Sequence, residues 1–306
     1  MKHRILSVAL VLALCLCLTG CKSSDYKKAV GLQESGDYQA AAEMFQALGD
    51  YQDSAIRLGT CNDFITAIES FNNAVSGLEE KNGILDAAIK AAEAVAYSDA
   101  KCLDESLRPT LETGISETKA AKVNAPSLPT DLATITEATE NMGNVDYSSV
   151  LGSLAEKQDA LDKSIKQYAL VDNPDESYVI TCLGKVAGIV DIAAATEDND
   201  PNGQLHKAGG YTAAVYFSHQ NVDQSRVFGD SLIDKGTDAG GQVEVYATPE
   251  DAAKRDNYLA AFDGSAFSSG SHTVIGTCVI RTSNELKASQ QNELSVNIIE
   301  ELTKLQ

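Results

Sequence analysis

The sequence contains no tryptophan, and aromatic residues make up only 6% of its 306 residues. A sugar-binding site of the stacking type needs exposed aromatic rings, so this shortage weakens that class of site. Basic residues are also scarce, with 24 Lys and Arg against 44 Asp and Glu and a formal net charge of -20. Phosphate backbones and anionic lipid headgroups repel so acidic a chain, which argues against nucleic acid as a partner.

The common catalytic and metal-binding motifs are missing as well. There is no nucleophile elbow, no Cys-x-x-Cys pair, no His-Glu-x-x-His sequence and no phosphate-binding loop. Ser271 precedes His272, but neighbouring side chains on an extended chain point in opposite directions, and a catalytic triad requires converging groups. We interpret this segment as a turn before a strand. The sequence therefore predicts a protein without enzymatic activity.

The N-terminus has the three regions of a bacterial secretory signal. Basic residues at 2–4 precede an apolar run over 5–18, which is shorter than the roughly 20 residues of a membrane-spanning helix. The ending Leu18-Thr19-Gly20-Cys21 resembles the lipobox of bacterial lipoproteins. The resemblance implies a signal peptide over 1–20, a covalent lipid on Cys21 and a mature chain anchored to the extracellular face of the cell membrane. Loss of Lys2 and Arg4 with the signal would bring the net charge near -22.

Four further cysteines remain in the mature chain, at positions 61, 102, 182 and 278. An exported protein can oxidise Cys182 with Cys278, or Cys61 with Cys102. The alternative is a set of isolated buried thiols, because a free cysteine packs like a small apolar residue. We favour the buried thiols.

Residues 21–61 contain a short internal repeat, in which Gly36-Asp37-Tyr38-Gln39 recurs as Gly49-Asp50-Tyr51-Gln52. Glycine suits the end of one helix and aspartate the start of the next, which predicts short helices over about 25–35, 38–48 and 51–60. The pattern resembles one tetratricopeptide-like unit of surface proteins from Gram-positive-type bacteria. Such repeats usually need about three copies to bury a core. We therefore expect this unit to pack on the following helices or on a partner.

Residues 62–170 show helical periodicity almost throughout. We expect three or four antiparallel helices, forming a bundle or a rod. Pro109 is expected to end or kink a helix, and Pro126 and Pro129 mark a connection.

Residues 171–306 have a different pattern, which starts at Asn173-Pro174 with runs of β-branched residues. The predicted strands cover 189–197, 211–218, 242–248 and 272–282, and the predicted helices cover 175–187, 249–262 and 284–304. Pro249 suits the first turn of a helix. The predicted fold class is thus a helical hairpin or bundle region followed by an α+β sandwich, with helices on one face of a four-stranded mixed sheet.

Two charged features of this C-terminal part are candidates for ion binding. Asp198-x-Asp200-x-Asn202-Gly203 matches the first half of an EF-hand calcium loop, in which alternate oxygens and the carbonyl of Gln204 would bind Ca²⁺. Position twelve is Gly209 rather than glutamate, and a polar turn without an ion is the alternative interpretation. Arg281 lies in an apolar strand, where we expect an edge position or an ion pair rather than a bound anion.

Several segments of 171–306 resemble a module of surface lipoproteins from Gram-positive-type bacteria, some of which carry an extracellular-matrix-binding-homologue label. These segments are 197–203, 209–213, 234–238 and 276–283. The resemblance implies a surface adhesion or interaction protein with a protein or cell-wall partner. One alternative is a surface binding protein for a small ligand or a cell-wall fragment. A glycan hydrolase is less favoured, although it would need only two facing carboxylates.

Overall fold

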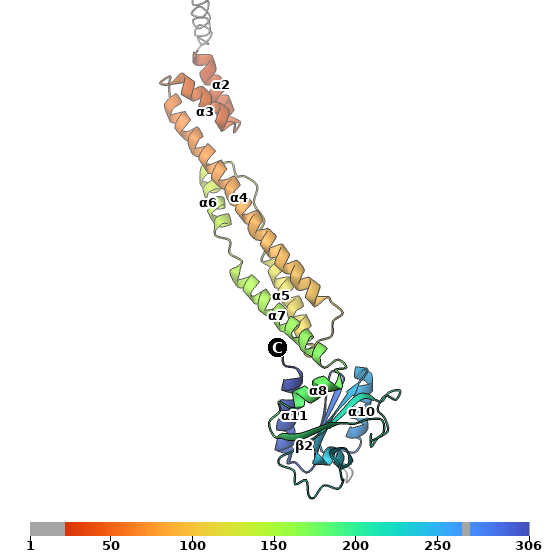
Figure 1. Ribbon diagram of the computed structural model, residues 1–306. Coiled ribbons are helices and arrows are strands. Elements are labelled where there is room, and N and C mark those ends of the chain that lie inside the picture. The colour runs from red at the N-terminus through yellow and green to blue at the C-terminus, as the bar shows by residue number, and fades with distance from the viewer. Residues whose placement is uncertain (1–21, 265–269, 306) are drawn as a thin grey trace, which may run out of the picture. The chain divides into compact units, whose positions relative to one another are not determined.

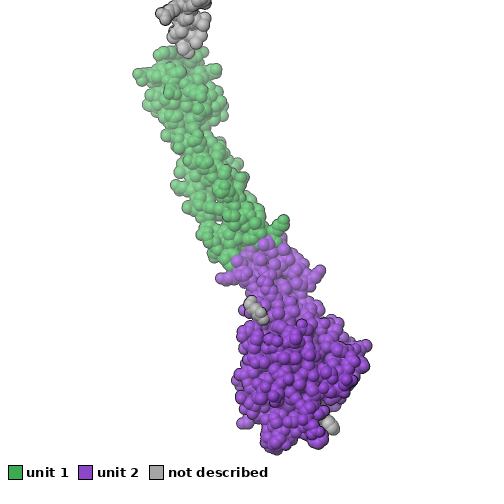
Figure 2. All heavy atoms as spheres, in the orientation of Figure 1, with its two compact units in different colours: residues 1–90, 117–152 green, residues 91–116, 153–306 purple. Residues whose placement is uncertain are grey.

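The computed structural model describes residues 22–264 and 270–305. The chain divides into two compact units, shown in separate colours in Figure 2. Unit 1 contains residues 1–90 and 117–152, and unit 2 contains residues 91–116 and 153–306.

The N-terminal part of unit 1 begins with helices α2 (Lys22–Glu34) and α3 (Tyr38–Leu48), which confirms the first two predicted helices. The side chain of Asp37 accepts a hydrogen bond from the amide of Ala40 and starts α3, and Gly49 ends it with a φ of 61°. A buried cluster joins α2 and α3 to the start of the next helix; its members include Ala29, Phe45 and Cys61. The repeat therefore packs on the helix that follows it, as expected.

The predicted third short helix is wrong. Residues 54–60 are the first turns of α4 (Ser54–Ala96), a continuous helix of 43 residues. No proline lies within α4, and the apolar spacing continues beyond Cys61, so nothing in the chain stops the helix there.

Three further helices complete the helical region: α5 (Leu107–Ala120), α6 (Leu132–Gly143) and α7 (Ser148–Leu170). Pro109 lies in the first turn of α5, where its missing amide costs no hydrogen bond, so it opens a helix instead of ending one. Pro126 and Pro129 lie in the connection to α6, as predicted. In unit 1, Ile135 and Met142 of α6 pack against Phe71 and Leu78 of α4.

The α+β part of unit 2 contains a five-stranded antiparallel sheet in the order β1-β2-β3-β5-β4. Its strands are β1 (Ile189–Ala194), β2 (Tyr211–His219), β3 (Gly240–Tyr246), β4 (His272–Ile275) and β5 (Cys278–Thr282). The predicted four-stranded mixed sheet is therefore wrong. The segment 272–282 is a hairpin rather than one strand, because the chain reverses at Gly276, which has a φ of 59°.

Helices cover both faces of this sheet, whereas the sequence predicted them on one face only (Figure 1). The helices are α8 (Glu176–Leu183), α9 (Leu232–Lys235), the 3₁₀ helix η1 (Gly236–Ala239), α10 (Pro249–Ala260) and α11 (Ala288–Leu302). One core contains buried residues of α8 and α11, such as Leu183 and Ile298. The other contains residues of α9 and α10, such as Ile233 and Leu259. The strands alternate between the two cores because successive side chains point to opposite faces.

The change from helical to α+β structure falls between the end of α7 and the start of α8, where the composition changes. Val171 at this point is fully buried in the core beneath α8 and α11. Its carbonyl oxygen accepts a hydrogen bond of 2.9 Å from the amide of Thr277. The boundaries predicted after residues 61 and 170 stay predictions.

Candidate functional site

A buried cluster of charged side chains lies between the sheet and α10. Glu244 of β3 is fully buried, and its carboxylate accepts two hydrogen bonds of 2.8 Å from Nε and Nη2 of Arg255 on α10. Nη1 of Arg281 on β5 donates to the same carboxylate at 3.2 Å. We call these three residues the Glu244 cluster. Arg281 lies on an internal strand, so its predicted edge position is wrong and its predicted ion pair is confirmed.

Neutral side chains extend the Glu244 cluster. The hydroxyl of Tyr246 donates to Glu244 Oε2 at 2.9 Å, and Arg281 Nη1 donates to Gln242 Oε1 at 3.2 Å. Burial raises the pKa of the Tyr246 phenol, and the negative charge of Glu244 raises it further. Burial acts against the charge of Arg255, but the hydrogen bonds and charge of Glu244 outweigh it, so the guanidinium pKa is raised. The cluster therefore holds its charged groups in fixed positions.

The loop 198–210 holds the residues predicted to bind calcium. The carboxylate of Asp200 accepts hydrogen bonds from the amides of Asn202 (3.1 Å), Gln204 (2.6 Å) and Leu205 (2.8 Å), and from the hydroxyl of Tyr211. Burial acts to raise the pKa of Asp200, but these hydrogen bonds outweigh it and hold the pKa below its usual value.

The structure thus brings three of the four predicted ligands together. Asn202 Nδ2 donates to the Tyr211 hydroxyl at 3.3 Å, and Gln204 contacts Asp200 through its amide, whereas Asp198 is exposed in the preceding turn. Hydrogen-bond donors surround the Asp200 carboxylate and satisfy the oxygens that a cation would otherwise bind. Within residues 22–264 and 270–305, no group of three or more His, Cys, Asp or Glu side chains could hold a metal ion. The calcium site stays a prediction.

A hollow of about 400 Å³ lies between this loop and α10, and we call it the α10 pocket. Residues that line it include Asn202, Gln204, Tyr211, Tyr246, Lys254 and Arg255. Tyr258 also lines it, with 58% of its surface exposed, and the guanidinium carbon of Arg255 lies 5.5 Å from the centre of the Tyr258 ring. Lys254 Nζ lies 2.7 Å from the carboxylate of Asp251. The pocket therefore combines two cationic groups, the carboxylate of Asp251, phenols and amides.

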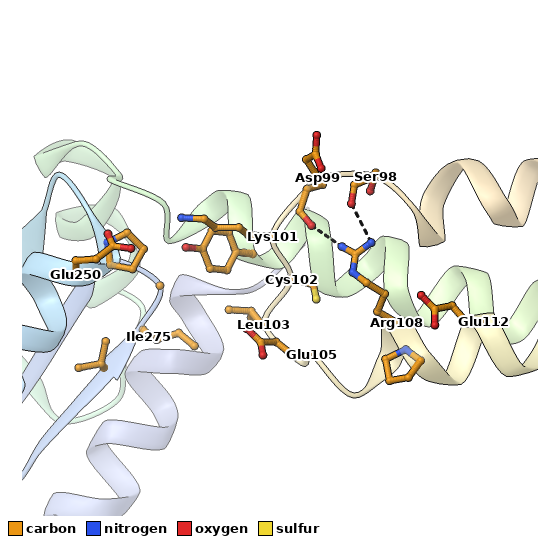
Figure 3. Close-up of a pocket in the computed structure, with 16 residues that line it drawn as sticks. Ser98, Asp99, Lys101, Cys102, Leu103, Glu105, Arg108, Glu112, Glu250 and Ile275 are labelled. Carbon is orange, nitrogen blue, oxygen red and sulfur yellow. Dashed lines mark hydrogen bonds between the residues drawn. The ribbon is translucent and has the colours of Figure 1, made fainter.

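A larger hollow of about 770 Å³ lies elsewhere in unit 2 (Figure 3). Arg108 points to the turn after α4 and donates to the carbonyls of Ser98 (3.0 Å) and Ala100 (2.6 Å), while Glu250 and Ile275 lie on the other side. Lys101 Nζ lies 5.8 Å from the centre of the Tyr168 ring. Both basic groups are thus engaged in structural contacts. The acidic lining residues are Asp99, Glu105, Glu112 and Glu250.

The serine beside His272 does not contact the imidazole. Ser271 Oγ lies 2.6 Å from Thr282 Oγ1, whereas the two ring nitrogens of His272 face Asp256 (2.6 Å) and Asp263 (3.4 Å). Strand β4 begins at His272, which confirms the start of the predicted strand.

The four cysteines at 61, 102, 182 and 278 are free and buried, as predicted. Burial raises the pKa of the Cys278 thiol to about 12 and also raises that of Cys182. A thiolate is the reactive form of cysteine, so these environments suit packing rather than nucleophilic chemistry.

Sequence reasoning missed Glu244 and Arg255 as parts of a site. A signal was present, because Glu244 stands between two valines in a predicted strand, where a charge must find a partner. No pattern in the sequence indicates that Phe228 is exposed.

The predicted lipidation site Cys21 and the predicted signal peptide 1–20 lie outside the described residues. In the part of the chain that the structure describes, no helix is long and apolar enough to cross a membrane. Comparisons of the chain with protein-family models, with curated proteins and with solved structures gave no match.

Proposed function

We propose that this chain is a lipid-anchored extracellular interaction protein that acts by binding rather than by catalysis, with its α+β part as the binding part. The observation that carries the proposal is Phe228, which follows β2 in the loop 220–231 and is 97% exposed. The other exposed large apolar side chains range from 38% to 73%. Phe228 is therefore presented to solvent more fully than any of them.

Contacts on the N-terminal side of Phe228 hold its loop in place. Val222 is buried in the core beneath α8 and α11, and Val227 packs against that core. Gln224 Nε2 donates to the carbonyl of Ala239 at 2.7 Å, and Lys235 Nζ donates to the carbonyl of Gln224 at 3.1 Å. The exposed Phe228 therefore follows a segment that is anchored to the core.

An aromatic side chain held in this way is suited to a binding surface. Single apolar residues on a surface are common, but full burial of a phenylalanine contributes about 1.5–3 kcal/mol. A partner that covers Phe228 gains this energy. Aromatic anchors of this kind contribute much of the energy of protein interfaces.

The two alternative functions have different places in the molecule. Binding of a small ligand or a cell-wall fragment is supported by the α10 pocket. A carboxylate-dependent glycan hydrolase would have to use the acidic side chains of the larger hollow, such as Glu105 and Glu250. In the α10 pocket, the acidic lining residue Asp251 is engaged by Lys254 and Thr248. Binding is therefore the function that this pocket favours.

We expect Phe228→Ser to weaken binding to a protein partner about tenfold or more, because a central aromatic anchor contributes 2 kcal/mol or more. The probes are purified fibronectin, fibrinogen and collagen, each tested by surface plasmon resonance against the soluble chain. The matched control is Val296→Ser, which removes an apolar side chain that is 52% exposed on α11. If none of the three probes binds, or if both variants bind as the unmodified chain does, the adhesion proposal is wrong.

The lipid anchor has its own test. We expect Cys21→Ser to leave the protein as an uncleaved precursor or to release it into the medium, because a hydroxyl cannot replace the thiol that accepts the lipid. Detergent phase partitioning and mass spectrometry of the expressed protein measure this. The control is Cys61→Ser, which should still partition into detergent. A Cys21→Ser protein that partitions into detergent at the mature mass would contradict the anchor.

A further inference from the structure

We propose that the α10 pocket is a binding site for a small ligand with a free carboxylate, held by Arg255 and Lys254 against the ring of Tyr258. The site lies apart from Phe228 in the sequence and rests on different contacts, so it can be tested independently of the adhesion proposal.

Arg255 is arranged in advance as an anion-binding group. Nε and Nη2 are both bound to Glu244, which fixes the plane of the guanidinium, and Nη1 takes no part in that pair. Its position over Tyr258, at 5.5 Å, limits its movement further. A guanidinium matches the geometry of a carboxylate, and less conformational entropy is lost when it is already fixed.

The acidic groups at the wall of the pocket are already engaged, in a chain with a net charge of -20. Glu244 pairs with Arg255, and the lining carboxylate of Asp251 pairs with Lys254 and accepts a hydrogen bond from Thr248. The nearby carboxylate of Asp200 is already bound to backbone amides and to Tyr211. The carboxylates of Glu244, Asp251 and Asp200 are thus each held by hydrogen bonds or ion pairs, while Arg255 Nη1 takes no part in the pair with Glu244.

The remaining lining suits a small polar molecule. Tyr246 donates its hydroxyl hydrogen to Glu244, so its oxygen can accept a hydrogen bond from a ligand, whereas the Tyr211 oxygen already accepts one from Asn202. Asn202 and Gln204 add amide groups. A side chain at Gly209 would point towards Asp251 Oδ1, 4.0 Å from the Cβ position, so glycine keeps this wall open. A volume of about 400 Å³ is at the small end of ligand pockets.

Charge favours a carboxylate over a phosphate. Asp251 and Glu250 lie in the first turn of α10, next to the cationic residues. A dianion is repelled by these acids and by the acidic chain more strongly than a monoanion. The shared chemistry is thus a single carboxylate on a polar body, which either the end of a peptide or an acidic sugar can supply.

The experiment titrates residues 22–306 with four probes and monitors binding through NMR chemical shifts. N-acetyl-alanyl-alanine carries a free carboxylate. The same peptide with an amidated C-terminus is the neutral control. Glucuronate represents an acidic sugar, and inorganic phosphate represents the dianion. We expect saturable binding of the peptide acid or of glucuronate, which also identifies the source of the carboxylate. The amide and phosphate should bind at least about tenfold more weakly.

Variants connect the binding to the pocket. Lys254 is mostly exposed, so Lys254→Gln should leave the fold intact and weaken carboxylate binding about threefold to fivefold. Tyr258→Leu should weaken it by a similar factor, because the platform beneath Arg255 is lost. Lys185→Gln is the matched control, since this exposed lysine lines a different hollow, and it should bind as the unmodified chain does.

The proposal would be overturned by no binding of either carboxylate, by equal binding of the acid and the amide, or by full binding by both Lys254→Gln and Tyr258→Leu. Tighter binding of phosphate would overturn it as well. None of these results bears on Phe228, whose test uses protein probes.

Discussion

Replacement of Glu244 by alanine is expected to lower the free energy of unfolding by about 3–5 kcal/mol. The carboxylate is fully buried and accepts hydrogen bonds from two guanidinium groups. Without it, Arg255 and Arg281 lie close together on the buried face of the sheet and lose the charge that they share. The cost arises mainly from these desolvated cations and less from the lost methylene groups.

Two further variants separate charge from shape, with chemical denaturation followed by circular dichroism as the measurement. Glu300→Ala removes an exposed carboxylate from α11 and should change stability by no more than about 0.5 kcal/mol. A triple variant with Glu244→Leu, Arg255→Met and Arg281→Met removes all three charges and should recover most of the loss. A loss of less than about 1 kcal/mol for Glu244→Ala would mean that the cluster does not depend on its carboxylate.

Sequence reasoning predicted most reliably those elements whose limits depend on nearby residues. Helix α3 begins where Asp37 binds the amide of Ala40, and α10 begins where Thr248 precedes Pro249. In both cases the group that starts the helix lies within four residues of the contact that it makes. Such contacts form from the local sequence alone, so their signals are visible without a structure.

The sheet was predicted less well because its topology depends on distant contacts. Val274 and Ile275 on one side of Gly276, and Cys278 and Val279 on the other, have the composition of a single strand. The reversal at Gly276 places its backbone against Val171, which is about a hundred residues away in the sequence. Local propensity carries no information about that contact. The sequence therefore predicted one strand where the structure has two, and a mixed sheet where the structure has an antiparallel one.

In the candidate site, too, the features set by nearby residues were predicted and those set by distant contacts were not. The alternate oxygens of Asp198, Asp200 and Asn202 were visible in the sequence, and they do belong to an ordered loop. The groups that satisfy Asp200, however, are backbone amides and the hydroxyl of Tyr211, whose approach depends on the folded loop. The charged partners of Glu244 come from two other elements, α10 and β5, so the buried charge indicated that a partner exists but not which residues supply it.

The contact between Gly276 and Val171 leads to a second large expected effect, from Gly276→Ala. A Cβ atom at Gly276 would lie 2.4 Å from the carbonyl oxygen of Val171 and 2.7 Å from its Cγ2 atom. Both are shorter than any normal contact, and the carbonyl is backbone, which cannot rotate away. That oxygen also accepts hydrogen bonds from the amide and the hydroxyl of Thr277, at 2.9 and 3.1 Å. Relief of the clash must therefore move Val171 out of the core or break these bonds.

Gly203→Ala is the matched control, because Gly203 has a φ of 63° against 59° for Gly276 and no atom lies within 4 Å of its Cβ position. Alanine at either position has the same backbone strain, about 1–2 kcal/mol. Gly276→Ala should cost about 1–3 kcal/mol more, since it adds overpacking to that strain. Urea unfolding of the two variants gives the difference, and hydrogen exchange at the Thr277 amide should be faster only in Gly276→Ala. Equal stabilities of the two variants would show that the chain can move at Val171 without cost, and that this contact does not hold the hairpin in place.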